Sequence, residues 1–488
     1  MAKRSAALTL QLDPTDNTPL QRQIYRTIRD AIVHGGLVEN DRLPSIRKLA
    51  ETNRVSHTTV EQAYTQLVAE GYVRSVPRSG YVVEKLDTNY LTMAHEDIAH
   101  EVRQALEARS RDAFFSENIR GLKARYDFSY ASLQPDSFPV GIWRRLIGDV
   151  LFASTAPEFS RYAHTGEPNA LATELARYLG ISRGVNCLPE QVILHAGTDG
   201  AVESVLQLFD RDVDVIGMEE PGYATVREVA ERLKYRLVPI PTDKGSGAFI
   251  DALRLCKPKV VFTTPSHQFP TGRVLRLNAR TELIKWAQEA DAYIIEDDCC
   301  NEYRYEADPV PSLQSLDAFG RVIYLGSVSK VLSPSLRIAY SVLPPQLLGR
   351  YYRLFNTAHS AVSLLEQEVL ARFIREGYWA QHVRRMAKDN MRRHDVLLSS
   401  LLKEMEGRIA ISGMHSGMHL YVTVLNDMTQ AELIESAFNQ GAAVYGTKRF
   451  WFSRPAPENN IMIGFSSIDI DDIPSGVTAL ARAWFPHE

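Results

Sequence analysis

The sequence predicts two folded parts, a small α+β domain at the N-terminus and a large α/β body with a mainly parallel sheet. Residues 1–85 contain three short helical patterns followed by two β-prone runs, and from residue 191 onward strand-like and helical segments alternate. Such alternation is typical of parallel sheets, whose ligands bind at the carboxyl ends of the strands. We place a linker at 86–126 and the body at 127–488, with a smaller C-terminal α+β subdomain at 380–488.

Composition narrows the class of protein. The 488 residues are 45% hydrophobic and 23% charged, as in an ordinary folded protein. No apolar run approaches the roughly 20 residues of a membrane span, and no apolar segment of a signal peptide follows the first residues. The four cysteines lack the paired spacing of a disulfide framework or a zinc site. We therefore expect a cytoplasmic protein without a metal and without a membrane partner.

The N-terminal segment has the pattern of a helix-turn-helix with a β-hairpin wing. Pro19 precedes a helix whose apolar residues fall four apart, and a second short helix begins at Ser45. Ser56 is placed to cap a third helix, and the runs 71–76 and 80–83 form the hairpin. The N-terminal residues of such a recognition helix meet base edges in the major groove of double-stranded DNA. A three-helix protein-interaction module is the alternative.

This segment resembles the winged helix of the GntR regulators. The similarity lies in Leu43-Pro44-Ser45, in Val55-Ser56, in the stretch 59–67 and in Glu70-Gly71-Tyr72. The resemblance implies a set of residues that face DNA: Arg47, Ser56, His57, Thr58, Thr59 and Gly80. In the linker that follows, Leu91, Ala94, Ile98, Val102 and Leu106 are spaced as in an amphipathic helix, and the pattern does not distinguish a tether from a rigid arm.

One lysine in the body has neighbours in the sequence that could bind a phosphate next to its amine. Ser327 and Ser329 lie three and one residues before Lys330, and Arg337 follows it by seven, all after a strand-like run at 321–325. Hydroxyls and a guanidinium bind phosphate, while a lysine amine forms a Schiff base with the aldehyde of pyridoxal phosphate. A solvated Ser/Lys loop is the alternative for this stretch alone.

Other notable side chains also follow predicted strands. Gly197, Thr198 and Asp199 open a helix, where backbone N–H groups favour an anion. Tyr223 could stack on a planar cofactor, although a tyrosine packed over a turn explains it equally well. Asp297 at a buried strand end needs a cation, which a protonated pyridine nitrogen would supply. A metal is the competing explanation, but no His/Asp cluster at ligand spacing accompanies these acids.

Taken in order, these pieces resemble the fold-type I aminotransferases, a class of pyridoxal phosphate-dependent transferases. The resemblance implies that Asp297 pairs with the pyridine nitrogen, that Tyr223 stacks on the ring, and that Tyr162 reaches in from a partner subunit. It implies a phosphate and cofactor site formed by Gly197, Thr198, Asp199, His267, Ser327, Ser329, Lys330 and Arg337. With a GntR head in front, the chain is similar to the MocR/GabR subfamily, which implies a head-to-tail homodimer that responds to an amine or amino acid.

Three positions depart from the family pattern. Phe269 stands where aminotransferases usually have asparagine, and Thr225 stands where some relatives carry an arginine that clamps a second anion. Cys299 replaces a tyrosine that donates to the 3-oxygen of the cofactor. Because a thiol is a weak donor, we expect poor transamination, with Tyr303 or His267 as substitute donors. The adjacent Cys299 and Cys300 could instead form a redox-sensitive pair.

The sequence thus predicts a pyridoxal phosphate-dependent transcriptional regulator that senses an amine or amino acid through an aldimine on Lys330. Arg454, with Arg449 second, is the candidate for binding the carboxylate of the effector. A working aminotransferase and a regulator that senses pyridoxal phosphate itself are the alternatives. We expect a sensor rather than an enzyme with steady turnover, and a transamination half-reaction stays open.

Overall fold

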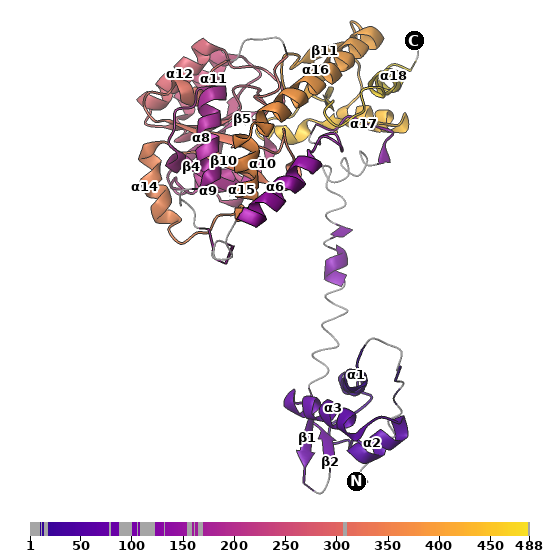
Figure 1. The fold of residues 1–488 in the computed structure, drawn as a ribbon. Helices are drawn as coiled ribbons and strands as arrows, with labels where there is room; N and C mark the ends of the chain where they lie inside the picture. Colours follow the sequence, from indigo (N-terminus) through magenta and orange to yellow (C-terminus); the bar gives the residue numbers. More distant parts are fainter. Residues whose placement is uncertain are drawn as a thin grey trace. The chain divides into compact units, whose positions relative to one another are not determined.

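The computed structural model describes residues 10, 12–13, 18–77, 80–86, 100–104, 106–107, 123–130, 132–153, 159–160, 162–163, 169–305 and 310–486. The chain divides into two compact units, Met1–Ser116 and Glu117–Glu488 (Figure 1). The division falls inside the predicted linker. Each unit is built around its own hydrophobic core.

The N-terminal unit contains three helices and one antiparallel hairpin. Ser45 and Ser56 cap the second and third helices, since their Oγ atoms accept hydrogen bonds from the N–H groups of Lys48 and Thr59 at 3.2 and 3.1 Å. Arg54, in the left-handed conformation, makes the turn between them. Arg78 and Ser79 at the predicted wing tip, and linker residues 87–99, lie outside the described residues. The elements are α1 (Leu20–Val33), α2 (Ile46–Asn53), α3 (His57–Ala69), β1 (Val73–Val76) and β2 (Gly80–Val83).

The body is organised on a seven-stranded sheet in the order β4-β10-β9-β8-β7-β5-β6, in which β10 is antiparallel to both its neighbours and the other pairs are parallel. The prediction of a mainly parallel sheet is confirmed. The bounds of its strands are β4 (Val192–Ala196), β5 (Val215–Glu220), β6 (Arg236–Pro241), β7 (Val260–Thr263), β8 (Tyr293–Asp297), β9 (Val322–Ser327) and β10 (Ile338–Val342).

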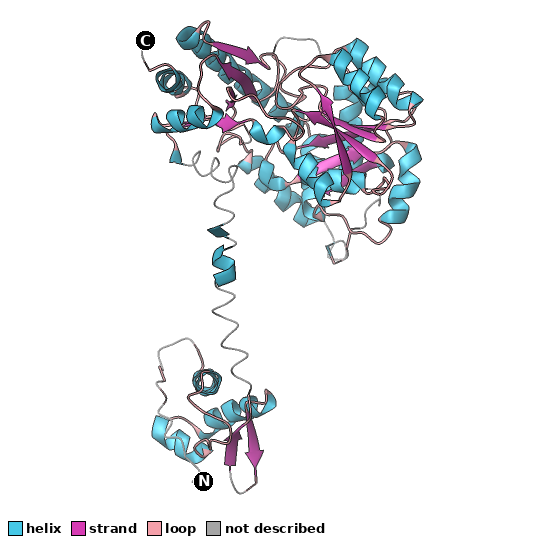
Figure 2. Cartoon of the chain, turned by 180° about the vertical axis from the view of Figure 1, so that it is seen from behind, coloured by secondary structure: helices cyan, strands magenta, loops and turns pink. Residues whose placement is uncertain are grey.

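Helices cover both faces of this sheet (Figure 2). Val260 and Phe262 of β7 pack in one core cluster and Val261 between them packs in another, as the two-residue period of a strand buried on both faces requires. One face carries α9 (Gly197–Leu206), α10 (Ala224–Arg232) and α14 (Pro345–Leu354), and the other carries α11 (Ser246–Cys256), α12 (Leu277–Glu289) and α13 (Leu313–Leu316). The body also contains α6 (Val140–Ala153), α8 (Ala170–Arg183), α15 (Leu364–Arg375) and the short helices η1 (Pro189–Gln191) and η2 (Pro334–Leu336).

A long helix, α16 (Tyr378–Met405), leads into a smaller α+β subdomain. Its four-stranded sheet has the order β11-β12-β15-β14, and the early strand β3 (Tyr126–Asp127) pairs in parallel with β13 (Ala442–Ala443). The start of the body therefore joins the subdomain that was predicted to begin at residue 380. The remaining elements are β11 (Ile409–Ser412), β12 (His419–Val424), α17 (Gln430–Asn439), β14 (Tyr445–Gly446), η3 (Lys448–Phe450), β15 (Asn460–Gly464) and α18 (Ile473–Trp484).

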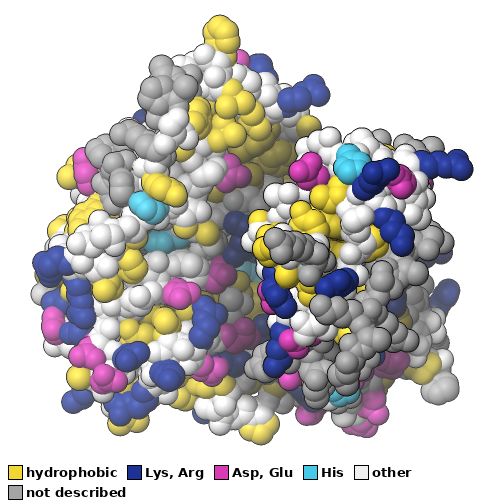
Figure 3. All heavy atoms as spheres, turned by 90° about the horizontal axis from the view of Figure 1, so that it is seen from below, with side chains coloured by type: hydrophobic (Ala, Val, Ile, Leu, Met, Phe, Trp, Pro, Cys, Tyr) yellow, Lys and Arg dark blue, Asp and Glu magenta, His cyan; other side chains and the backbone are white. Residues whose placement is uncertain are grey.

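The surface carries both signs of charge. Lys and Arg side chains are interspersed with Asp and Glu over the face that Figure 3 shows. No helix in the described part of the chain is long and apolar enough to cross a membrane. The described residues also contain no group of three or more His, Cys, Asp or Glu that could hold a metal ion.

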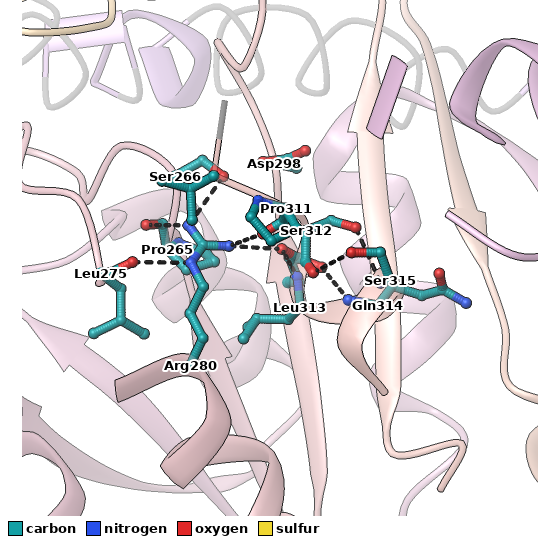
Figure 4. Close-up of polar contacts among 12 residues, drawn as sticks. Pro265, Ser266, Leu275, Arg280, Asp298, Pro311, Ser312, Leu313, Gln314 and Ser315 are labelled. Carbon is teal, nitrogen blue, oxygen red and sulfur yellow. Dashed lines mark hydrogen bonds and ion pairs between the residues drawn. The ribbon is translucent and has the colours of Figure 1, made fainter. Parts of the chain in front are cut away.

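A fully buried arginine fixes the loop that follows β7. Arg280 reaches from α12 into this loop and donates to the carbonyl oxygens of Leu275, Pro265 and Pro311 at 2.9, 2.8 and 2.8 Å (Figure 4). Its Nη1 lies 3.7 Å from the Glu296 carboxylate, which is itself fully buried. Because each carbonyl would otherwise be buried without a partner, this guanidinium holds together segments distant in sequence.

We predict that Arg280→Met lowers the free energy of unfolding of the body by about 3–5 kcal/mol, because it leaves Glu296 as a buried charge without its cation. Urea unfolding followed by tryptophan fluorescence measures this, since all five tryptophans lie in the body. The matched control is Arg276→Met, an exposed residue just before the same helix, which should change stability by no more than about 0.5 kcal/mol. Equal stability of the two variants would contradict the role of Arg280.

Candidate functional site

The strand register brings the predicted site residues to one edge of the sheet. Ala196 pairs with Ile338 across β4 and β10, and Ala339 pairs with Ser327 across β10 and β9. On the next strand, Asp297 pairs with Leu325. The residues in these pairs and next to them in the chain therefore lie together at this edge: Gly197, Thr198, Asp199, Ser327, Ser329, Lys330 and Arg337.

An anion cradle forms where α9 begins. Gly197 has φ 85°, and a Cβ there would collide with the guanidinium of Arg337. Ala196 offers no side-chain cap, so the first N–H groups of α9 keep their capacity to bind an anion. Arg337 forms an ion pair with the carboxylate of Asp199. The Oγ of Ser327 accepts from the Ser329 N–H at 3.1 Å and so orders the turn before Lys330.

Asp297 is a buried carboxylate suited to a cation. Asp297 is 5% exposed, and the N–H of Cys299 donates to Oδ1 at 3.2 Å. Burial, together with the charge of Asp298, raises the pKa of Asp297 to about 7, while the charge of Lys330 opposes this increase. A cation placed against Asp297 would favour the carboxylate form and would itself be stabilised.

Lys330 is half-buried and its backbone is anchored by Tyr303, whose hydroxyl donates to the Lys330 carbonyl oxygen at 2.8 Å. Tyr303 was one of two predicted substitutes for the missing tyrosine, and this bond engages its hydroxyl. A hydrogen bond with Cys300, together with burial, raises the pKa of the Cys299 thiol, which therefore stays protonated. Cys299 thus offers a neutral thiol near Lys330.

His267 is enclosed by protein. His267 is 3% exposed, its Nδ1 lies 2.9 Å from the Oγ of Ser416, and a Cβ at Gly417 would collide with its ring on the Nε2 side. Burial lowers the pKa of His267 well below its ordinary value, so the ring is neutral. These contacts tie the loop after β7 to the C-terminal subdomain, and a contact between His267 and the cofactor stays a prediction.

Tyr130, Tyr223 and Phe269 form an aromatic wall, which the sequence did not predict. The ring centroid of Phe269 lies 5.4 Å from Tyr223, 5.7 Å from Tyr130 and 4.9 Å from Phe450. Tyr130, Tyr223 and Phe269 are half-buried. Behind them packs a buried cluster formed by Ala224, Tyr421, Tyr445, Phe450, Trp451 and Met462.

Arg454, the predicted carboxylate binder, is already paired. Its Nη2 lies 2.6 Å from Asp243, its Nε lies 3.6 Å from Glu220, and its guanidinium stacks over the Trp451 ring with the centroid 4.7 Å away. Arg449, the second candidate, lies 3.2 Å from Glu228.

Tyr162 is 73% exposed and stacks on His359 of its own chain, with ring centroids 4.3 Å apart. Its predicted contact with a cofactor in a partner subunit stays a prediction.

In the N-terminal unit, exposed polar side chains gather at the start of α3. His57 and Thr58 are exposed on its first turn, and Ser56 and Thr59 lie with their hydroxyl oxygens 2.6 Å apart. Arg47 on α2 is exposed and pairs with Glu51 at 2.9 Å. Gly80, with φ 81°, opens β2 of the wing. This arrangement offers hydroxyl groups at the start of the recognition helix α3 and a guanidinium on the adjacent helix α2.

Comparisons with known proteins agree with both units. Residues 20–83 match the family of bacterial regulatory proteins called the gntR family, and residues 134–455 match aminotransferase class I and II. The chain is 36% identical over 477 residues to the HTH-type transcriptional regulator YdeL of Bacillus subtilis, covering 98% of this chain and 99% of that protein. It is 33% identical over 479 residues to the probable rhizopine catabolism regulatory protein MocR of Rhizobium meliloti, with 98% and 96% covered.

The chain belongs to the MocR-type subfamily of GntR regulators. This MocR-type chain is therefore a transcriptional regulator that binds DNA through its winged helix. The body is also similar in fold to a multiple substrate aminotransferase from Thermococcus profundus, with a TM-score of 0.68 and 24% identity over 77% of this chain and 95% of that chain. Pyridoxal phosphate is the cofactor that the aminotransferase domain implies.

The residues of this MocR-type regulator fit pyridoxal phosphate. The α9 N-terminus, Ser327 and Arg337 would hold the phosphate, and Gly197 leaves the room that a side chain would fill. The carboxylate of Asp297 would hold the proton of the ring nitrogen, and Lys330 supplies the amine for the aldehyde carbon. Asp199 does not suit a phosphate site, because its negative charge competes with the phosphate for Arg337.

We predict that Asp199→Asn strengthens binding of pyridoxal phosphate by about two- to fivefold, the size expected for a half-exposed ion pair. Arg337→Gln should weaken it at least tenfold, because a charged phosphate contact is lost. Titration of cofactor-free protein with pyridoxal phosphate, followed by absorbance, measures both constants. Weaker binding by the Asp199→Asn variant would show that Asp199 instead holds Arg337 in place for the phosphate.

Proposed function

We propose that this regulator senses a small primary amine or amino acid through pyridoxal phosphate at Lys330 and transmits binding of that effector to its DNA-binding head. One observation carries the proposal. A lysine, a buried carboxylate and an anion cradle meet at one sheet edge, in a chain whose other unit is a winged helix. Coupling of the two units requires that the effector binds two conformations of the body with different affinity.

Each residue of the site has a separate role toward the cofactor or the effector. When bound, pyridoxal phosphate supplies an aldehyde that condenses with amines and a ring that withdraws electrons. Lys330 is the resident amine that an effector amine must replace. Asp297 keeps the ring nitrogen protonated, and Tyr223 with Phe269 covers the ring side of the site. Arg454 stacks on Trp451, a residue of the buried cluster that packs against Phe269.

We also propose how the chain meets its partners. The residues that face double-stranded operator DNA are Arg47, Ser56, His57, Thr58, Thr59 and Gly80. The protein acts as a head-to-tail homodimer, in which Tyr162 of one subunit reaches the cofactor of the other. As a DNA-binding regulator, it acts in the cytoplasm, where bacterial DNA is found.

Absorbance spectra of the full-length protein with bound cofactor test the sensing role. We expect a visible band that depends on Lys330 and that shifts when a panel of primary amines and amino acids is added. The Lys330→Ala variant should lack this band. A band of equal intensity in Lys330→Ala would contradict the role of the lysine, and a regulator that senses the cofactor itself would then explain the chain better.

We predict that Cys299→Tyr increases the rate of transamination, because a phenol donates a stronger hydrogen bond than the thiol it replaces. With Cys299 the protein should stop after at most one half-reaction, as suits a sensor. A coupled assay with an amino donor and a keto acid, run over many turnovers, measures this. An unchanged rate and an unchanged cofactor spectrum in Cys299→Tyr would exclude the thiol as the cause of slow turnover.

A further inference from the structure

We propose that the effector is a primary amine with an apolar or aromatic body and no carboxylate, and that Asp243 is the residue that excludes carboxylates. This inference rests on the proposed function and narrows its effector class. Two independent features of the described residues carry it, the aromatic wall beside Tyr223 and the pairing of Arg454, which stacks on Trp451 in the cluster behind that wall, with two carboxylates of this chain.

The aromatic wall gives an effector an apolar surface. Tyr130, Tyr223 and Phe269 are half-buried, and Phe269 contacts the other two at 5.7 and 5.4 Å between centroids. Met462 lies fully buried in the cluster behind them. An apolar or aromatic body gains by leaving water for such a surface, and aromatic groups gain further from edge-to-face contacts.

Three arginines that contact the cluster or flank it in the chain are already paired. Each of them lies near a carboxylate of this chain. Arg454 stacks on Trp451 and lies 2.6 Å from Asp243, while Arg449 lies 3.2 Å from Glu228. Arg227, which donates to the carbonyls of Arg449 and Trp451, lies 3.5 Å from Glu231.

Arg454 is held from two sides. Glu220 is 2% exposed and accepts hydrogen bonds from the N–H groups of Phe452 and Ser453 at 2.7 and 2.6 Å, which fixes it beside Arg454. Asp243 is half-buried and makes the closer contact. Arg273 donates to the Asp243 carbonyl oxygen at 3.0 Å and so helps to hold that residue in place.

A carboxylate on the effector would therefore have to displace Asp243 from Arg454 and would meet the negative charge of Glu220. An amine without a carboxylate requires neither change. Asp243 is accordingly the position at which the chain selects against amino acids, and its replacement by asparagine should release Arg454 for a carboxylate.

Spectral titration of the full-length protein with bound cofactor tests this with a matched pair of ligands, 2-phenylethylamine and phenylalanine, which differ by one carboxylate. We expect wild type to bind 2-phenylethylamine at least tenfold more tightly than phenylalanine. In Asp243→Asn this ratio should fall at least fivefold through tighter binding of phenylalanine. In the double variant Asp243→Asn/Arg454→Gln, the gain for phenylalanine should disappear.

The control is Asp251→Asn, an acid on α11 that pairs with Arg254 at 3.7 Å and should leave the ratio as in wild type. Near-ultraviolet circular dichroism checks that each variant keeps its fold. A wild type that prefers phenylalanine, or an Asp243→Asn variant with an unchanged ratio, would overturn the inference while the sensing role stands. If no amine or amino acid shifts a band that depends on Lys330, the proposed function fails, and this inference fails with it.

Discussion

The site depends on the hydrogen-bonded register of four neighbouring strands. Because β10 runs antiparallel between β4 and β9, its first residue lies against the ends of both, and Arg337 directly precedes it. The parallel pair β8 and β9 then places Asp297 beside the strand that leads to Lys330. A slip of one residue in this register would turn alternate side chains to the other face and separate the phosphate cradle from the lysine. The large buried core on both faces of the sheet fixes that register.

Three arginines of the body form ion pairs with carboxylates of the same chain. Arg337 pairs with Asp199, Arg454 with Asp243, and the deeply buried Arg280 with Glu296. The third pair, with its carbonyl partners, is structural, since Arg280 is fully buried in the loop it supports. The first two are partly exposed, and in our proposal they lie where the negative charge of a phosphate or of a carboxylate would be placed. There, each internal carboxylate competes with the ligand and makes binding selective rather than strong.

Local patterns in the sequence were enough to predict the strands, the recognition helix with its Ser56 cap, and the clustering of Lys330 and Asp297 at strand ends. These features depend on short apolar runs and on the residues that directly follow them. The environment of His267 could not be predicted, because its partner Ser416 lies 149 residues away and no periodicity links the two. The aromatic wall and the carboxylates around Arg454 were missed for the same reason, since both join the sheet to the C-terminal subdomain.

The most direct test of the account is the affinity of full-length protein with bound cofactor for DNA selected in vitro by the protein itself, measured with and without a saturating amine. We predict that the amine that shifts the cofactor spectrum changes the DNA dissociation constant of wild type by at least about fivefold, the lower range of allosteric coupling. Lys330→Ala should bind the same DNA and show no such change. An equal change in Lys330→Ala, or no change in wild type, would contradict a sensor that acts through this lysine.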